Sequence, residues 1–353
     1  MSTTEMTSLE RVLTTLGHKE PDRVPLFLLF SMYGAKELKM PIKEFFSKPE
    51  YVVEAQLALR KKFRHDCIYP FFYAPVEVEA WGGEVIYTEN GPPNSGKPFI
   101  RNIEDIKNLT VPNVKETPCL IKVLEATRML KERVGDEVPI IGVAISPFSL
   151  PVMQLGFDKY IDLIHNNPEL FNHLMEINEQ FVADWANAQL EAGATAICYF
   201  DPVSSSTIIP RELYLKTGFE IAKRMMTKIN GPTATHMASG MSIPILGDIA
   251  QTGTAIACTS SKEDLAEVKS HIKGKLSVLG NLNGIEMRTW TPEQAEAEVK
   301  KAIAKAGPGG GFILSDNHGE IPYQVPEEVL MAISDAVHKW GKYPLDWIET
   351  EKI

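Results

Sequence analysis

The sequence predicts an α/β protein with a TIM, or (β/α)8, barrel fold. Short apolar runs rich in β-forming residues alternate with amphipathic helical stretches, which is the pattern of a parallel sheet built from βα units. There are eight such runs, at residues 23–30, 67–72, 138–146, 194–200, 233–237, 254–259, 276–280 and 311–315. The 353 residues do not force a division, because barrels of this kind often exceed 200 residues. We therefore expect one domain over residues 1–353.

The helices expected between these strands show apolar residues three and four positions apart. In the stretch 167–193, Leu170, Leu174, Ile177 and Phe181 follow this spacing. Asn167 is placed to cap this helix, Pro168 to start it and Gly193 to end it. The stretches 291–307 and 325–341 repeat the same plan, with a Thr or Pro start and a Gly stop.

Residues 73–112 do not follow the βα plan. Alternating side chains around a Gly-Gly pair and the turn "NGPPNSG" indicate a β-hairpin. We expect a β-hairpin insertion after the second strand, overhanging a mouth of the barrel.

The composition excludes several classes of partner. A formal net charge of -10, without a Lys/Arg-rich run, argues against nucleic acid and anionic membranes, whose binding relies on cations. No run approaches the ~20 apolar residues of a membrane span, and the N-terminus lacks an apolar signal core. A cytoplasmic location is expected. The four cysteines are far apart, which favours buried free thiols over a metal or redox motif.

Polar residues follow the strands where a TIM barrel gathers its chemistry, at the C-terminal strand ends. Two carboxylates, two histidines and an asparagine meeting at one mouth can recognise a polar heterocycle and handle a proton. The expected strand-end residues are Ser31 and Met32, Tyr73, Ser146, Asp201, His236, Thr259, Asn281, and Asp316 with Asn317 and His318.

Each of these residues also has a purely structural interpretation. Asp201 precedes a proline and is suited to an Asx turn, and Asn281 lies in the turn-like "GNLNG". His236 ends an apolar strand, where structural histidines are common, and Asp316 and His318 lie beside a glycine that can shape a loop. Their shared placement, more than any single residue, favours a site.

Several segments together resemble the uroporphyrinogen decarboxylase superfamily, in its corrinoid-dependent methyltransferase branch. They cover nearly the whole chain in order: "HKEPDRVPLFLLF", the stretch from "ISPFSLPVMQLGF" to "YFDPVSSSTIIP", "THMASG", "VLGNLNG" and "ILSDNHGEIPYQVPEEVL". The fold that this resemblance implies is a TIM barrel.

The chain departs from two patterns of that superfamily. Decarboxylases carry an arginine-rich motif after the first strand, where this chain reads Phe30 to Ala35 without an arginine. Thiol-methylating members bind zinc through His-x-Cys after strand 5 and a Cys after strand 8. Here His236 is retained, but Ala238 replaces the first cysteine and His318 stands at the second position.

The missing cysteines bear on the methyl acceptor. A thiol needs zinc to become a thiolate at neutral pH, and catalytic zinc normally has three protein ligands. An amine is already nucleophilic. N5 of tetrahydrofolate is such an amine, and its pterin ring presents an edge that Asp and Asn side chains can hydrogen-bond. Within the superfamily, the chain resembles the members without the zinc motif, such as the methylcorrinoid:tetrahydrofolate methyltransferases of glycine betaine demethylation.

The resemblance implies transfer of a methyl group between cobalamin on a corrinoid carrier protein and tetrahydrofolate, giving methyltetrahydrofolate. No zinc is expected, and a homodimer is a possible assembly. His236, His318 and Asp316 are the candidates for handling the N5 proton. The pterin candidates are Asp201, Asn281 and Asp316, then Asn283, Asn317 and Tyr199, with Tyr73, Phe148 and Met32 as wall residues.

Two other interpretations stay open. The first is a zinc-dependent methyltransferase to the thiol coenzyme M, in which His236 and His318 bind metal with a third ligand such as Asp316 or Glu320. The second is a non-catalytic corrinoid-binding barrel that lost activity with its cysteines.

Overall fold

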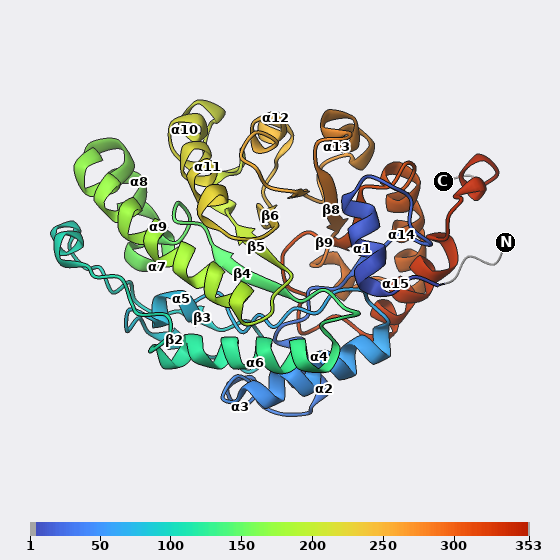
Figure 1. Ribbon diagram of the computed structural model, residues 1–353, viewed down its shortest axis with the longest axis horizontal. Coiled ribbons are helices and arrows are strands. Elements are labelled where there is room, and N and C mark those ends of the chain that lie inside the picture. The colour runs from blue at the N-terminus through green and yellow to red at the C-terminus, as the bar shows by residue number, and fades with distance from the viewer. Residues whose placement is uncertain (1–4, 352–353) are drawn as a thin grey trace.

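A curled parallel sheet forms the centre of the computed structural model, which describes residues 5–351 (Figure 1). Its strands lie in the order β1-β9-β8-β7-β6-β5-β4, and every neighbouring pair is parallel. The bounds are β1 (Leu26–Phe27), β4 (Ile141–Ile145), β5 (Ala196–Phe200), β6 (Thr233–His236), β7 (Ile256–Cys258), β8 (Ser277–Leu282) and β9 (Phe312–Asp316). Each falls on an expected apolar run, and β8 and β9 extend past it by two residues and one residue.

The eighth position of the ring is filled by a segment that forms only a bridge. Ile68 pairs in parallel with Ile140, and the Asp66 N–H donates to the Leu26 carbonyl at 2.7 Å, so this segment joins β4 to β1. The prediction of a TIM barrel is confirmed. The expected strand 67–72 is shortened because the Gln56 side chain takes over the pairing: it donates to the Phe30 carbonyl at 2.7 Å and accepts from the Tyr69 N–H at 3.2 Å.

Long helices surround the sheet on its outer face (Figure 1). They are α4 (Pro49–Phe63), α6 (Pro118–Val134), α8 (Phe157–Asn166), α9 (Pro168–Glu191), α11 (Gly218–Lys228), α13 (Leu265–Ile272), α14 (Pro292–Ala306) and α15 (Glu327–Trp340). The three expected helices correspond to α9, α14 and α15. Thr291 caps α14 through a capping box, whereas the Asn167 side chain makes no capping hydrogen bond to α9, contrary to expectation.

Short helices connect these elements. They are α2 (Tyr33–Glu37), α3 (Ile42–Phe45), α5 (Val76–Glu79), α7 (Pro151–Leu155), α10 (Arg211–Lys216), α12 (Leu246–Ile249) and the 3₁₀ turns η1 (Ile103–Asn108), η2 (Pro202–Ser204), η3 (Ile243–Ile245), η4 (Glu286–Arg288) and η5 (Asp346–Glu349).

The expected hairpin insertion is present as the antiparallel pair β2 (Val85–Ile86) and β3 (Asn94–Ser95). Val85 pairs with Ser95 and Ile86 with Asn94. The Gln324 side chain donates to the Asn90 carbonyl at 2.7 Å, so the turn of this hairpin lies against the segment that follows β9.

Helix α1 (Ser8–Leu16) covers the N-terminal end of the barrel. Its apolar residues Leu9, Val12, Leu13 and Leu16 face barrel residues, including Ile313, across a cavity of about 60 Å³. The interior of the barrel is apolar. It contains Phe27, Leu29, Cys67, Tyr69, Val143, Cys198, Cys258, Leu279 and Ile313. All four cysteines are buried and free, as expected.

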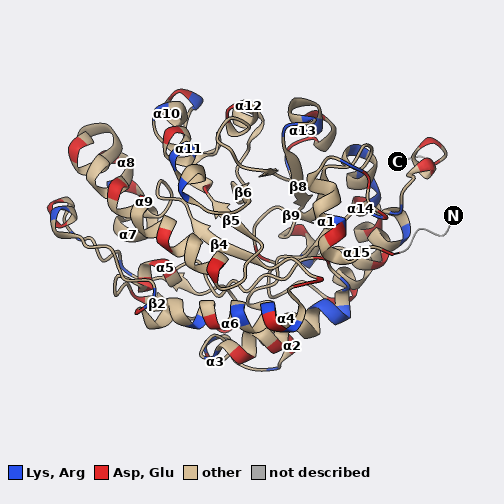
Figure 2. Cartoon of the chain, viewed as in Figure 1, with Lys and Arg blue, Asp and Glu red and all other residues tan. Residues whose placement is uncertain are grey.

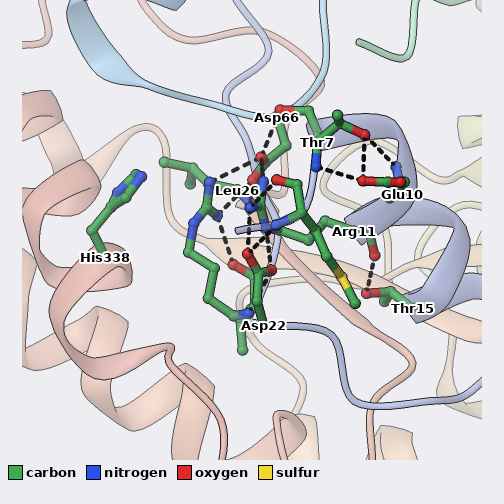
Figure 3. Close-up of polar contacts among 12 residues, drawn as sticks. Thr7, Glu10, Arg11, Thr15, Asp22, Leu26, Asp66 and His338 are labelled. Atoms are coloured by element: carbon green, nitrogen blue, oxygen red, sulfur yellow. Dashed lines mark hydrogen bonds and ion pairs between the residues drawn. The ribbon is translucent and has the colours of Figure 1, made fainter. Parts of the chain in front are cut away.

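A buried ion network joins α1 to the start of the barrel (Figure 3). Asp66 accepts from Arg11 at 2.7 Å, from Arg23 at 2.7 Å and from the Leu26 N–H at 2.8 Å. Arg11 also pairs with Asp22 at 2.6 Å. The two arginines hold the pKa of Asp66 below its usual range against the opposing effect of burial.

Charged side chains lie on the surrounding helices, with both signs mixed, while the central strands carry few of them (Figure 2). Within residues 5–351, no helix has the length and apolar character needed to cross a membrane.

Candidate active site

A cavity of about 420 Å³ opens at the C-terminal ends of the strands, within the size range of small-molecule sites. Its walls come from β4 and β5, from the segment after β4 with α7 and the start of α8, and from the segments after Ile68, β5, β6 and β9. The lining residues are Phe71, Ala74, Val143, Ile145, Ser149, Val152, Met153, Phe157, Phe200, Pro202, Val203, Ile208, Ala238, His318, Gly319 and Glu320.

The cavity wall is mainly apolar and aromatic. Its polar side chains are Ser149, His318 and Glu320, and none of the described residues lining it is a lysine or arginine. A ligand that carries several negative charges would therefore lose its hydration without gaining a cationic partner, which is costly. The cavity suits a flat, largely neutral molecule with few polar contacts.

His318 is held in place by its neighbour Asn317. When the Asn317 amide is oriented to satisfy its hydrogen bonds, its nitrogen donates to Nδ1 of His318 at 2.6 Å and to the Leu282 carbonyl at 3.0 Å, while its oxygen accepts from the Ser261 N–H at 3.0 Å. The neutral imidazole then carries its hydrogen on Nε2. Burial lowers the pKa of His318, so the ring is a neutral donor at the cavity wall.

His236 lies behind the wall rather than on it. Its ring stacks on Phe200 at 4.4 Å, and its Nδ1 accepts from the Ala238 N–H at 2.9 Å. Nε2 is buried, without a partner among residues 5–351. Burial, with a smaller effect of His318, lowers the pKa of His236 to about 3. His236 is therefore a neutral residue that supports Phe200 and the Ala238 turn.

Asp316 shapes the loop that carries His318. Its Oδ2 accepts from the N–H groups of His318 at 2.9 Å and Gly319 at 3.1 Å. Its Oδ1 is buried and has no partner within the described chain. Burial raises the pKa of Asp316 to about 6. Asp316 lies behind the cavity wall, in contact with the backbone of two lining residues.

Glu320 is the carboxyl group that faces the cavity, and the sequence identified it only as a spare metal ligand. It accepts from the Met32 N–H at 3.1 Å. Burial raises the pKa of Glu320 to about 7. Its place four residues beyond the end of β9 was the available signal, because the polar cluster of β9 continues through the loop.

Asp201 reaches the cavity only through a serine. Its Oδ1 accepts from Ser146 at 2.5 Å and from Ser149 at 2.7 Å, and Ser149 lines the cavity. Burial raises the pKa of Asp201. Tyr199 is fully buried outside the lining, and its hydroxyl has no partner in the part of the chain that the structure describes. Both residues lie behind the wall formed by β5.

Asn281 and Asn283 line a second, polar cleft of about 450 Å³ beside α14, not the apolar cavity. The Asn281 amide donates to the carbonyls of Ser260 at 2.8 Å and Glu263 at 3.0 Å. Asn283 accepts from the N–H groups at the start of η4. These contacts secure the loops after β7 and β8.

The three expected wall residues are buried outside the cavity lining. Tyr73 donates to Glu79 at 2.6 Å and packs on Phe46. Phe148 packs against Phe171, and Met32 contributes its backbone N–H to Glu320. The aromatic wall consists instead of Phe71, Phe157 and Phe200.

The described residues contain no group of three His, Cys, Asp or Glu side chains placed to hold a metal ion. At the position after β6 where a cysteine ligand would stand, Ala238 contributes only its backbone N–H, and that group is bonded to His236.

A family model described as uroporphyrinogen decarboxylase (URO-D) matches residues 7–340. The chain belongs to this family. Two URO-D relatives are proteins named uroporphyrinogen decarboxylase. The one from Alkalilimnicola ehrlichii is 25% identical over 353 residues, covering 94% of this chain and 93% of the relative. The one from Methylococcus capsulatus is 26% identical over 308 residues, covering 84% and 85%.

A solved structure shares the URO-D fold of this chain over nearly its whole length. It is described as a methyltransferase from Methanosarcina mazei, with a TM-score of 0.85 and 23% identity, and covers 95% of this chain and 99% of that one. At this identity the likeness establishes the fold of the barrel.

Proposed function

We propose that this URO-D family protein transfers a methyl group between a corrinoid on a carrier protein and N5 of tetrahydrofolate. The observation that carries the proposal is the cavity at the strand ends. It combines aromatic walls with one imidazole and one carboxyl group, and no lysine or arginine among the described residues lines it.

The cavity suits a pterin ring. Phe71, Phe157 and Phe200 offer flat apolar surfaces for a bicyclic ring. His318 offers an N–H donor, and Ser149 adds a hydroxyl oxygen that is held by Asp201. Asp201, Asp316 and Asn317 act in this proposal as positioning residues, because their contacts run through residues on the wall.

The second substrate is a corrinoid, which supplies a methyl group bound to cobalt and takes it back in the reverse direction. The mouth of the cavity is apolar at its edge, where Phe157 and Ile208 are each 44% exposed. This edge is the proposed contact for the corrinoid and its carrier protein. Holding two large substrates over one mouth supplies much of the rate through positioning.

The names of the URO-D relatives raise decarboxylation as a second candidate. A porphyrinogen carries several acetate and propionate groups, so its site needs cations. The segment after β1 has no arginine from Phe30 to Ala35, and no described cationic residue lines the cavity. The chemistry of this cavity therefore favours methyl transfer over decarboxylation.

The residues at the positions of the zinc ligands argue against thiol methylation. Zinc activation of a thiol needs about three protein ligands. Ala238 has no donor side chain, and Nδ1 of His236 already accepts from the backbone N–H of Ala238. Tetrahydrofolate presents an amine that reacts without this activation.

The deciding experiment mixes the purified protein anaerobically with methylcob(III)alamin and either tetrahydrofolate or coenzyme M. No metal is added, and formation of cob(I)alamin is followed by absorbance. We expect tetrahydrofolate alone to drive demethylation, with no effect of a zinc chelator. Turnover only with coenzyme M, stopped by the chelator, would establish the zinc enzyme instead. Corrinoid binding without transfer to either acceptor would establish a non-catalytic barrel.

A further inference from the structure

We propose that the carboxyl group of Glu320 is the acid/base that exchanges the N5 proton of tetrahydrofolate. This inference rests on the proposed function and assigns the proton step to one residue. It differs from the sequence-based expectation, which named His236, His318 and Asp316 for this role.

The backbone on both sides of Glu320 is fixed. The Gly319 carbonyl accepts from the Tyr69 hydroxyl at 3.2 Å, and the Ile321 N–H donates to the Leu29 carbonyl at 2.9 Å. Oε1 of Glu320 accepts from the Met32 N–H at 3.1 Å. The Ser31 side chain is a further hydrogen-bond partner of this carboxyl group, and Glu320 lines the cavity, where a ligand can exchange a proton with it.

The surroundings of Glu320 place its proton exchange near neutral pH. The titratable groups that face it are Asp316, His318 and Tyr69, and no described cation lies within ion-pair distance. Burial raises the pKa of Glu320 to about 7, and the charge of Asp316 adds to the rise. A pKa close to the working pH is the favourable condition for a general acid or base.

The three residues expected from the sequence are less suited to accept this proton. His236 and Asp316 do not line the cavity. His318 does, but Asn317 donates to its Nδ1, and Nε2 carries the hydrogen. Its imidazole is thus a donor toward the cavity, without a free acceptor atom. Glu320 is the lining group that both accepts and releases a proton.

The proposed transfer forms one bond, breaks one bond and releases one proton. The N5 lone pair forms the bond to the methyl carbon, and the cobalt–carbon bond breaks with its electron pair left on cobalt, which is reduced from Co(III) to Co(I). The N5 proton passes to the Glu320 carboxylate and then to solvent. In the reverse direction, protonated Glu320 gives its proton to N5 of methyltetrahydrofolate, which makes the amine a leaving group. The electron pair of Co(I) then forms the cobalt–carbon bond, the N5–methyl bond breaks with its pair left on N5, and cobalt is oxidised to Co(III).

The test compares the wild type with Glu320→Gln in both directions across pH. In the wild type, transfer to tetrahydrofolate should rise with pH through about 7, because the carboxylate is the active form, and transfer from methyltetrahydrofolate should fall over the same range. The variant retains an oxygen for the Met32 N–H. We expect the rates of the variant in both directions to be independent of pH over this range. Its kcat should fall about 100-fold or more, with tetrahydrofolate binding little changed.

The matched control is Glu212→Gln, which removes an exposed carboxyl group on α10 and should keep the wild-type pH profiles. A second variant, Glu320→Ala, is tested with added formate, which should raise the transfer rate of this variant at least tenfold. The Glu320 proposal is overturned if Glu320→Gln keeps the wild-type rates and pH limbs, or if His318→Asn alone removes them. Absence of wild-type transfer at every pH instead overturns the proposed function, and the proton step with it.

Discussion

Asn317 donates a hydrogen bond to Nδ1 of His318 at 2.6 Å, and this contact leaves the hydrogen of the neutral imidazole on Nε2. The two residues, adjacent in sequence, therefore have different roles. Asn317 is anchored on the β7–β8 side through Ser261 and Leu282, and His318 presents an N–H to the cavity.

Replacing this donor by an anion should change the protonation of His318. In Asn317→Asp, a carboxylate stands beside Nδ1, and an opposite charge at that distance typically raises a histidine pKa by about one unit or more. We expect the pKa of His318, now lowered by burial, to rise in an NMR titration of the imidazole. The variant Asn317→Ala, which removes the contact without adding charge, is the control. An unchanged pKa in Asn317→Asp would show that Nδ1 is not bonded to this side chain.

His236 should destabilise the fold on acidification. Its pKa in the folded protein is about 3, well below the ordinary value of 6.5. Well above pH 6.5 the histidine is neutral in both the folded and the unfolded chain, and stability is unaffected. Below it, the unfolded chain binds the proton first, so stability is lost as pH falls. At pH 5.5 the loss amounts to about 1.4 kcal/mol.

Urea unfolding at pH 7 and pH 5.5 measures this contribution. His236→Gln should lose less stability between the two pH values than the wild type, by about 1.2 kcal/mol. The exposed His165→Gln serves as the control. An identical pH dependence in His236→Gln and the wild type would mean that His236 titrates normally in the fold.

Gly319 and Gly309 form a matched pair for testing the packing behind the cavity. Both have left-handed backbone angles, with φ of +90° and +78°. A Cβ on Gly309 meets nothing within 4 Å, whereas one on Gly319 would lie 2.4 Å from the Phe200 ring. Gly309→Ala should therefore cost only the backbone strain of about 1–2 kcal/mol in unfolding free energy.

Gly319→Ala should cost clearly more, because Phe200 is stacked on His236 and cannot move freely. It should also weaken tetrahydrofolate binding, since Phe200 lines the cavity. Urea unfolding and a binding titration check the two effects. Equal stability losses in the two variants would show that Phe200 yields without cost.

Asp66 is expected to be the most sensitive charged residue for stability (Figure 3). Asp66→Asn leaves Arg11 and Arg23 buried with too little negative charge, and breaking a buried pair typically costs 3–5 kcal/mol. The control, Asp335→Asn, breaks an exposed pair with Arg64, which is worth about 0–1 kcal/mol. Unfolding free energies in urea give both values, and a loss below about 1 kcal/mol for Asp66→Asn would contradict the prediction.

The fold could be predicted from the sequence because barrel strands are local signals. The run 138–146 is apolar up to Ser146, since strands of a parallel barrel are buried on both faces, and β4 formed within it. The shortening of the expected second strand, 67–72, was harder to predict. Its pairing was replaced by Gln56, a residue on α4 whose position in space no local pattern reveals.

The site was harder to predict because strand-end polarity does not say where a side chain points. Asn281 ends an expected strand, yet it turns to the carbonyls of the loop after β7. Much of the wall comes from the segment between β4 and α9, through Ser149, Met153 of α7 and Phe157 at the start of α8, where no strand period applies. Asp316, the last residue of β9, bonds the backbone, whereas His318 and Glu320 in the loop after it line the cavity, a division that only the folded loop defines.

Helix α1 has a consequence for how the polypeptide is made. Its apolar face is buried partly against Ile313, which is translated almost three hundred residues later. At ribosomal speeds of roughly 5–20 residues per second, that face lacks part of its cover for roughly 15–60 s. A nascent chain thus emerges with an exposed amphipathic segment well before its docking surface is complete. Chaperones that bind such segments should associate with the translating ribosome for most of the time taken to synthesise the chain.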